Sequence, residues 1–275
     1  MFNVQESGMI NNGGSGVKVG IIDGAIDVKH KEFRGFTNIY QKYCGVYSDH
    51  GTAVCSIIKS KNFGLLNGAS IYSYPVYKSG SSGNLNGCHL TDIGRAISSA
   101  INDQCDIINI SGASVTNNTK GIQYIVSLAT KAIKKNIFII SSVGNEAKVN
   151  QPMPASIPGI LSVGSCDQKG KPSFYNNVIN RGKLTYCCPG DNIKTAIVDD
   201  NYRFCTGTSF STPIFSCLIG SIIYIFRTKG ITYTHKDIID MINNNSKSVI
   251  YRGRECKIVN FNILHQLIMN IGVKQ

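Results

Sequence analysis

The chain has 275 residues, of which 42% are hydrophobic and 16% charged, and this composition excludes disorder over most of its length. The formal net charge is +12. Lys and Arg are scattered, and no zinc-finger, RNA-binding or helix-turn-helix pattern accompanies them, so we expect attraction to an acidic partner and no nucleic acid. One large α/β domain suits this length. We assign it to residues 1–275, with 1–16 as a short N-terminal extension and 230–275 as a C-terminal helical part.

The N-terminal segment has no feature of a secretory signal. Its sixteen residues, MFNVQESGMINNGGSG, contain neither a basic stretch nor an apolar one. We therefore expect a cytoplasmic protein, or a secreted one if the chain is a processed form.

Short apolar runs then alternate with segments of helical spacing. The runs are β-branched and lack a polar face, as parallel strands buried on both sides should be. The predicted strands are residues 17–22, 71–76, 106–110, 136–141 and 160–163. The predicted helices are residues 52–60, 91–102, 121–135, 209–228 and 235–243, with a further one near 262–271. This alternation predicts a doubly wound, mostly parallel β-sheet flanked by helices.

The longest apolar run, residues 213–226, reads PIFSCLIGSIIYIF. It is too short to span a bilayer and contains two serines, so we interpret it as a buried central helix and expect no membrane association. Residues 79–87 are rich in Gly, Ser and Asn, which predicts a surface loop and not a domain boundary.

Ten cysteines are spread along the chain without a C-x-x-C pair or a Cys/His cluster. We expect no metal site and no cofactor, and mostly reduced, buried thiols, with disulfides as the alternative.

Two polar residues follow or begin predicted elements in a way that suits proton transfer. Asp23 ends a strand in VGIIDGAID, where a carboxylate is held rigidly and can orient a histidine. His50, in DHGTAVCSII, precedes Gly51 and a helical stretch. Alone, the aspartate could be a turn former and the histidine a structural residue.

Two further segments offer a nucleophile and a hydrogen-bond donor. In GTSFSTPIFSCLIG, Ser209 opens the long apolar helix, where the dipole and free N–H groups favour a developing anion. Pro213 is expected near the first turn, where its missing N–H costs little. In FIISSVGNEA, Asn145 follows a strand and a glycine and is a candidate second oxyanion donor.

The motifs D-G-x-x-D-x-x-H, H-G-T, G-N-E and G-T-S-x-S-T-P together resemble the signature blocks of subtilisin-like serine proteases, in the order Asp, His, Ser. The resemblance covers roughly residues 17–229. It implies a serine endopeptidase with a subtilisin-like fold, in which Ser209 is the nucleophile, His50 the general base, Asp23 its orienting partner and Asn145 an oxyanion donor.

The same resemblance implies where an extended peptide substrate binds. Residues 81–85 should offer one edge strand and residues 111–113 the opposite one. Gly144 and Glu146 flank Asn145, and Glu146 could favour a basic residue before the cut. The stretch PMPASIPGILSVGS resembles the lining of that pocket. The implied substrate-binding residues are Ser81, Ser82, Gly83, Asn84, Leu85, Ser111, Gly112, Ala113, Gly144 and Glu146.

Departures from the usual pattern narrow the expected function. Gly24 and Ala25 follow the aspartate, as in branches that process ribosomally made peptides. Glu32 matches a calcium-ligand position but stands without its partners, so calcium is possible there but not supported. We find no inhibitory propeptide, which favours a selective protease acting on a leader or precursor peptide, such as an acidic leader.

Three alternatives stay open at this point: a general degradative protease, a catalytically inactive family member that binds peptides, and a hydrolase that uses Cys205. The sequence does not define the natural substrate or the oligomeric state.

Overall fold

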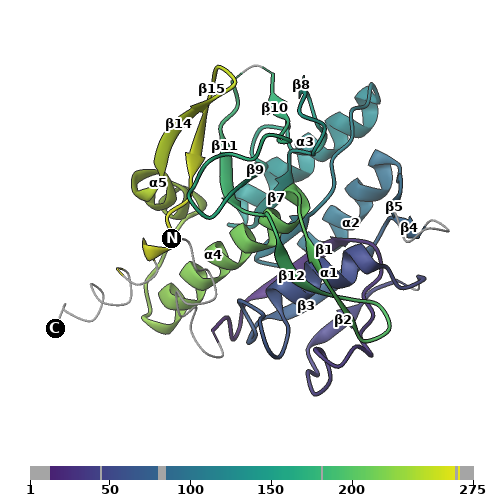
Figure 1. Ribbon diagram of the computed structural model, residues 1–275. Helices are drawn as coiled ribbons and strands as arrows, with labels where there is room; N and C mark the ends of the chain where they lie inside the picture. The colour runs from purple at the N-terminus through teal and green to yellow at the C-terminus, as the bar shows by residue number, and fades with distance from the viewer. Residues whose placement is uncertain (1–12, 44, 80–84, 181, 264–265, 267–275) are drawn as a thin grey trace.

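The computed structural model describes residues 13–43, 45–79, 85–180, 182–263 and 266. Within them the chain forms one large sheet with helices on both faces (Figure 1). The sheet has nine strands in the order β14-β15-β11-β9-β7-β6-β1-β3-β2. Their bounds are β1 Lys18–Asp23, β2 Ile39–Gln41, β3 Ser70–Pro75, β6 Ile107–Ile110, β7 Phe138–Ser142, β9 Leu161–Cys166, β11 Thr185–Pro189, β14 Lys247–Tyr251 and β15 Arg254–Ile258.

The predicted doubly wound, mostly parallel sheet is confirmed. All neighbouring strands run parallel except the edge strand β14, which is antiparallel to β15. The central strands β6, β7 and β9 are buried along their whole length, because helices cover both of their faces.

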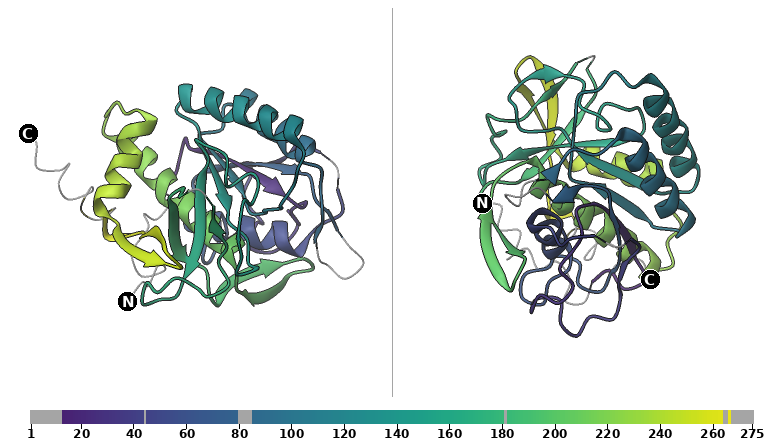
Figure 2. Two further views of the ribbon diagram at one scale, coloured as in Figure 1. Left: turned by 90° about the horizontal axis from the view of Figure 1, so that it is seen from above. Right: turned by 90° about the vertical axis from the view of Figure 1, so that its right-hand side faces the viewer.

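Helices cover the two faces in two separate groups (Figure 2). Side chains alternate between the faces, so Ile107 packs in one core and Ile108 in the other. The first core contains α1, α4 and α5, and the second contains α2 and α3. Their bounds are α1 Asp49–Ile58, α2 Leu90–Asn102, α3 Thr119–Lys134, α4 Thr208–Thr228 and α5 His235–Asn245.

Helix α4 is the central helix of the first core. It has a mean hydropathy of 1.7 over its most apolar stretch and is long enough to cross a membrane, but 89% of that stretch is buried inside the fold. This burial agrees with its interpretation as a core helix of the domain. Pro213 is the sixth residue of α4, just beyond the first turn near which it was expected.

The sequence predicts a helical C-terminal part, but the structure contains strands there as well as a helix. Helix α5 is followed by the β14–β15 hairpin, and β15 joins the main sheet by pairing in parallel with β11. The helix expected near 262–271 lies mostly outside the described residues. Three small two-stranded sheets complete the fold: β4 Lys78–Ser79 with β5 Leu85–Asn86, β8 Val149–Asn150 with β10 Val178–Ile179, and β12 Ile193–Ile197 with β13 Asn201–Cys205.

The strand order reverses at β1 and β6. From β1 the chain goes first to the edge strand β2 and then to β3, both on one side, and later crosses to β6 on the other side, after which β7, β9 and β11 follow outward. In open α/β sheets a crevice forms beyond the carboxyl ends of strands at such a reversal. Asp23 ends β1, and Ser111 follows the end of β6, so both lie at this crevice.

Candidate active site

Asp23 and His50 form a hydrogen-bonded pair at the end of β1. His50 Nδ1 donates to Asp23 Oδ1 at 2.8 Å and lies 3.0 Å from Oδ2. The Asp23 side chain is fully buried and also accepts from the Gly24 N–H at 2.7 Å, whereas the His50 side chain is 21% exposed. This geometry fixes the tautomer with the proton on Nδ1 and leaves Nε2 free to act as a base.

The start of helix α1 brings His50 to Asp23. Ser48 caps the helix by accepting from the Gly51 N–H, so His50 lies in the first turn. Gly51 packs directly on the loop after β1: a Cβ at this position would lie 2.2 Å from the Gly24 carbonyl oxygen. The absence of a side chain at Gly51 therefore sets the close approach of α1 to the carboxyl end of β1.

The Asp23 carboxylate changes the acid–base behaviour of His50. Burial alone would lower the pKa of the imidazole, but the negative charge of Asp23 and its hydrogen bond outweigh that effect and raise the pKa above 6.5. The protonated imidazole is thus stabilised, which suits a base that must hold a proton during a reaction.

Ser209 lies in the first turn of α4 and lines the same cleft as His50. Its Oγ donates to the carbonyl oxygen of Ser111 at 2.9 Å. The ring of Phe210, the next residue, lies 5.8 Å from the His50 imidazole between centroids. Transfer of the Ser209 proton to His50 therefore requires the hydroxyl to turn away from Ser111.

Asn145 is oriented by the loop that leads into α4. Its Oδ1 accepts from the Thr208 N–H at 2.9 Å. This hydrogen bond turns the Nδ2 donor group away from the Thr208 N–H and leaves it available to another acceptor. Gly207, with φ of +151°, passes close by: a Cβ there would lie 3.3 Å from Asn145 Nδ2. The Asn145 amide thus lies against the start of α4, where the first N–H groups have no partner within the helix.

These residues line a cleft of about 940 Å³. Ser111, Gly112 and Ala113, which follow β6, line it together with Gly144 and Glu146, the neighbours of Asn145. The Glu146 carboxylate accepts a short hydrogen bond from Asn177 Nδ2. Eight of the residues singled out from the sequence therefore share this cleft: His50, Ser111, Gly112, Ala113, Gly144, Asn145, Glu146 and Ser209.

The expected second edge strand is only partly described. Ser81, Ser82, Gly83 and Asn84 lie outside the described residues. Leu85 begins β5, which pairs antiparallel with β4, so this segment is one arm of a small hairpin. The residues that line the cleft just after β5 are Gly87, Cys88, His89 and Leu90.

Sequence reasoning missed three residues that shape the site. Tyr77 lines the cleft and donates its N–H to the Asp23 carbonyl at 3.3 Å. Met153 lines the cleft and exchanges backbone hydrogen bonds with Ser114 at 2.8 and 3.0 Å. Thr208 orients Asn145 through its N–H. Met153 lies in the proline-containing stretch already noted, which was the available signal; Tyr77 had none.

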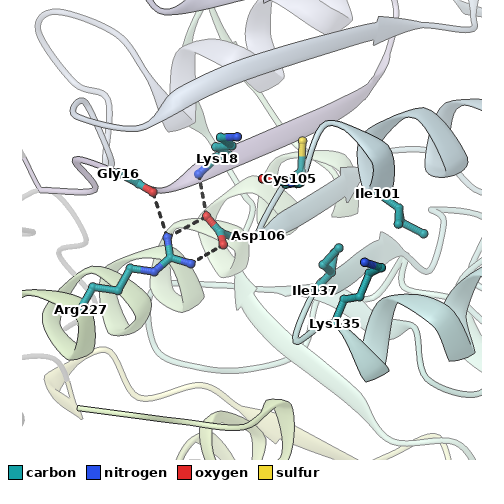
Figure 3. Close-up of a pocket in the computed structure, with 9 residues that line it drawn as sticks. Gly16, Lys18, Ile101, Cys105, Asp106, Lys135, Ile137 and Arg227 are labelled. Atoms are coloured by element: carbon teal, nitrogen blue, oxygen red, sulfur yellow. Dashed lines mark hydrogen bonds and ion pairs between the residues drawn. The ribbon is translucent and has the colours of Figure 1, made fainter. Parts of the chain in front are cut away.

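A second cavity, of about 440 Å³, lies at the amino ends of β1 and β6, which is the opposite edge of the sheet (Figure 3). Asp106 accepts there from the Lys18 N–H at 2.9 Å and from both terminal nitrogens of Arg227 at 2.5 and 3.0 Å. Asp106 and Arg227 form an ion pair there, and none of the residues that line this cavity is a serine or a histidine.

Glu32 and the cysteines bear on the metal and thiol alternatives. The Glu32 carboxylate accepts from Tyr202 Oη at 2.6 Å and from the side chain and N–H of Asn62 at 2.8 and 3.0 Å. The nine cysteines in the described part of the chain are free thiols. Cys205 does not line the cleft; its sulfur lies 3.3 Å from Thr195 Oγ1.

Solved structures with a similar fold include peptide maturation proteases. The prenylagaramide maturation protease PagA has a TM-score of 0.84 and 22% identity, covering 97% of this chain and 99% of that one. The patellamide maturation protease PatA has a TM-score of 0.78 and 23% identity, covering 94% and 98%. At these identities the similarity establishes the fold alone.

Curated relatives and a family model define the family. Subtilisin NAT of Bacillus subtilis subsp. natto is 26% identical over 85% of this chain, and this chain spans 61% of its length. Subtilisin of Bacillus pumilus is 25% identical, with 88% of each protein covered. The model described as "Subtilase family" matches residues 14–257. This match extends over most of the sequence, and the chain therefore belongs to the subtilase family.

Proposed function

We propose that this protein is a serine endopeptidase that hydrolyses peptide bonds through an acyl-enzyme. The observation that carries the proposal is the Asp23–His50 pair at the end of β1, facing a cleft that also contains Ser209 at the start of α4 and Asn145. A nucleophile, a base, the residue that orients the base, and an oxyanion donor are the four groups that acyl transfer requires.

The first chemical step forms the acyl-enzyme. Ser209 Oγ leaves the Ser111 carbonyl, gives its proton to His50 Nε2 and attacks the substrate carbonyl carbon. Asn145 Nδ2 and the Ser209 N–H stabilise the oxyanion, and Asp23 stabilises the imidazolium. His50 then protonates the leaving amine as the C–N bond breaks. In the second step water attacks the ester, again through His50, and releases the carboxylic product and free Ser209.

Substrate binds as an added strand in this proposal. Residues 111–113 follow the carboxyl end of β6 and line the cleft, where their backbone would pair with the peptide. An N–H of the peptide donating to the Ser111 carbonyl competes with the Ser209 hydroxyl for that acceptor. Substrate binding thereby favours the rotation that turns Ser209 toward His50.

Selective processing of a precursor peptide is the biological role that we favour. Solved neighbours with TM-scores of 0.84 and 0.78 are named as maturation proteases of prenylagaramide and patellamide. The net charge of +12 favours an acidic leader or other acidic segment in the substrate. The competing role is general protein degradation, as in a degradative protease of the same family. Indiscriminate digestion of unrelated proteins such as casein would favour that role over selective processing.

We propose further that activity does not depend on calcium at Glu32. Three N–H or O–H donors already occupy the oxygens of this carboxylate, and a cation would have to displace them.

The test of the proposed function is Ser209→Ala. We expect this variant to lose cleavage of the precursor peptide and labelling by a fluorophosphonate, while its thermal unfolding stays unchanged, because only the hydroxyl is removed. Wild-type protein should label once, at Ser209. Undiminished cleavage by Ser209→Ala would overturn the assignment, and the absence of both labelling and cleavage in the wild type would favour an inactive peptide-binding protein.

A further inference from the structure

Lys183 makes a set of contacts that the reaction does not explain. Its Nζ donates to three backbone carbonyl oxygens: those of Ala155, by a short hydrogen bond, Ile157 at 2.7 Å and Ile160 at 2.5 Å. The three acceptors come from a single turn-rich segment, residues 152–160, while Lys183 lies two residues before the start of β11. One amino group thus gathers three carbonyls that are close in sequence.

The three carbonyls form an oxygen ring of the kind that binds a cation. The residues that carry them, Ala155, Ile157 and Ile160, are at most 1% exposed. If Lys183 were lost, water could therefore not readily take its place as the hydrogen-bond donor to these carbonyls. Among the described residues no carboxylate forms an ion pair with Lys183, so the carbonyl dipoles alone face its charge. Burial lowers the pKa of this amine, but only the charged form has three N–H donors for three acceptors.

The ring is connected to the cleft through one residue. Met153 precedes the three carbonyl-bearing residues in the same segment and lines the cleft. It exchanges two backbone hydrogen bonds with Ser114, at 2.8 and 3.0 Å, and Ser114 directly follows residues 111–113, which line the cleft. The position of segment 152–160 is therefore transmitted to the side of the cleft along which a peptide would lie.

We infer that Lys183 is a positioning residue for substrate binding: its ammonium serves as a built-in cation that holds residues 152–160 in place, and with them Met153, which forms part of the cleft wall. The inference rests on the proposed peptidase function, because it concerns how a peptide is held. It does not concern the proton transfers at Ser209 and His50, which lie on other elements.

Lys59 offers a matched control. It is a buried lysine, whereas Lys183 is partly buried, and its Nζ donates to the carbonyls of Asn67 at 2.5 Å and Ala69 at 2.8 Å and lies 4.2 Å from the Phe36 ring centroid. It caps the end of α1 that is far from His50. Loss of Lys59 should therefore destabilise the fold as loss of Lys183 does, without acting on the cleft wall.

The experiment compares Lys183→Met with Lys59→Met on two substrates. One is a peptide long enough to fill the cleft, and the other is p-nitrophenyl acetate, which needs Ser209 and His50 but reaches no cleft wall. We expect Lys183→Met to raise KM for the peptide about tenfold, since small displacements of positioning groups have effects of this size or larger. Hydrolysis of the ester should stay within about twofold of wild type, and Lys59→Met should leave both unchanged.

Rescue by a small cation tests the role of the charge. In Lys183→Ala, added ammonium or methylammonium should refill the carbonyl ring and restore the peptide KM. Tetramethylammonium at the same ionic strength has no N–H donor and should not. If Lys183→Met or Lys183→Ala does not fold, Lys183→Gln takes its place, because it keeps two N–H donors but carries no charge. This variant must also raise KM for the peptide and leave hydrolysis of the ester unchanged.

Three results would overturn the inference: an unchanged peptide KM in Lys183→Met, an equal rise in Lys59→Met, or no response of Lys183→Ala to ammonium. Each of these results requires a wild type that cleaves the peptide, so none of them contradicts the proposed function. A wild type that cleaves neither substrate and does not label with fluorophosphonate defeats the proposed function instead.

Discussion

Asp23 has two tasks that follow from its complete burial. Its carboxylate accepts from the Gly24 N–H and from His50 Nδ1, so both the strand end and the imidazole ring are fixed. The same contacts decide the protonation of His50, because a buried negative charge favours the imidazolium. One side chain therefore sets the geometry of the base and the pH at which it works.

The first prediction concerns the pH dependence of the proposed reaction. His50 must be neutral to accept the Ser209 proton, so kcat/KM should fall as the pH decreases through its pKa, which Asp23 raises above 6.5. Asp23→Asn removes the charge that raises this pKa. We expect kcat to fall about 10⁴-fold and the acid limb of the residual activity to move to lower pH.

The measurement is kcat/KM for a peptide between about pH 5 and pH 9 in both proteins. Fluorophosphonate labelling rates over the same range supply a control that does not depend on peptide binding. An acid limb at the same pH in wild type and Asp23→Asn would show that Asp23 does not control His50.

At the scale of whole elements, the buried strands and helices were the ones that the sequence predicted well. The strands β1, β3, β6, β7 and β9 and the helices α1 to α5 begin and end within three residues of their predicted bounds. These strands are apolar because helices cover both faces, which produces a clear sequence signal. Strand β11, with the sequence TYCCP, carries two cysteines and a proline and was missed.

The hairpin β14–β15 shows why the C-terminal part was misjudged. Its strands, KSVIY and RECKI, are polar at many positions because β14 is an edge strand and its outer residues are exposed. Their weak alternation was outweighed by the helical spacing of α5 just before them. Tertiary pairing of β15 with β11, which the local sequence does not encode, completes the sheet.

The site was predictable as far as it rests on strand and helix ends. Asp23, His50, Ser209 and Asn145 each stand at such an end, so their convergence followed from the parallel sheet. Tyr77 and Lys183 could not be found in this way. Their roles depend on which loop carbonyls and which part of the cleft they meet, and loop geometry has no periodic signal.

The second prediction concerns the placement of helix α1. In Gly51→Ala the new Cβ would meet the Gly24 carbonyl oxygen at 2.2 Å, and because this oxygen belongs to the backbone, the helix start must move. We expect the free energy of unfolding to fall by about 1–3 kcal/mol and kcat/KM to fall further than stability explains, because His50 moves away from Asp23.

Chemical unfolding and peptide hydrolysis measure the two effects. Gly87→Ala is the matched control for stability, since a Cβ there meets no atom within 4 Å. If Gly51→Ala had the stability and activity of the wild type, the close approach of α1 to residue 24 would not be what places His50.

At the scale of the whole molecule, the two edges of the sheet have different roles. At the amino ends of the strands, the Asp106–Arg227 ion pair joins β6 to the last turn of α4, with an added hydrogen bond from Arg227 to the Gly16 carbonyl (Figure 3). At the carboxyl ends, loops present the cleft and Ser209. The long helix α4 connects the two edges: its N-terminus carries the nucleophile and its C-terminus is anchored in the ion pair.

The last prediction concerns the net charge of +12, which acts on a substrate before contact. A surface of this charge attracts an acidic leader through a field that salt screens, with a screening length of about 8 Å at physiological ionic strength. For a precursor with an acidic leader we therefore expect kcat/KM to fall roughly tenfold between low salt and about 0.5 M salt, while kcat at saturation stays constant.

The same peptide without its leader should show little salt dependence, because it lacks the opposite charge. Initial rates for the two substrates over one salt series provide the comparison, and a leader with neutral Gln and Asn in place of Glu and Asp is the matched control. Equal salt slopes for all three substrates would mean that the positive charge serves another purpose than recruiting an acidic leader.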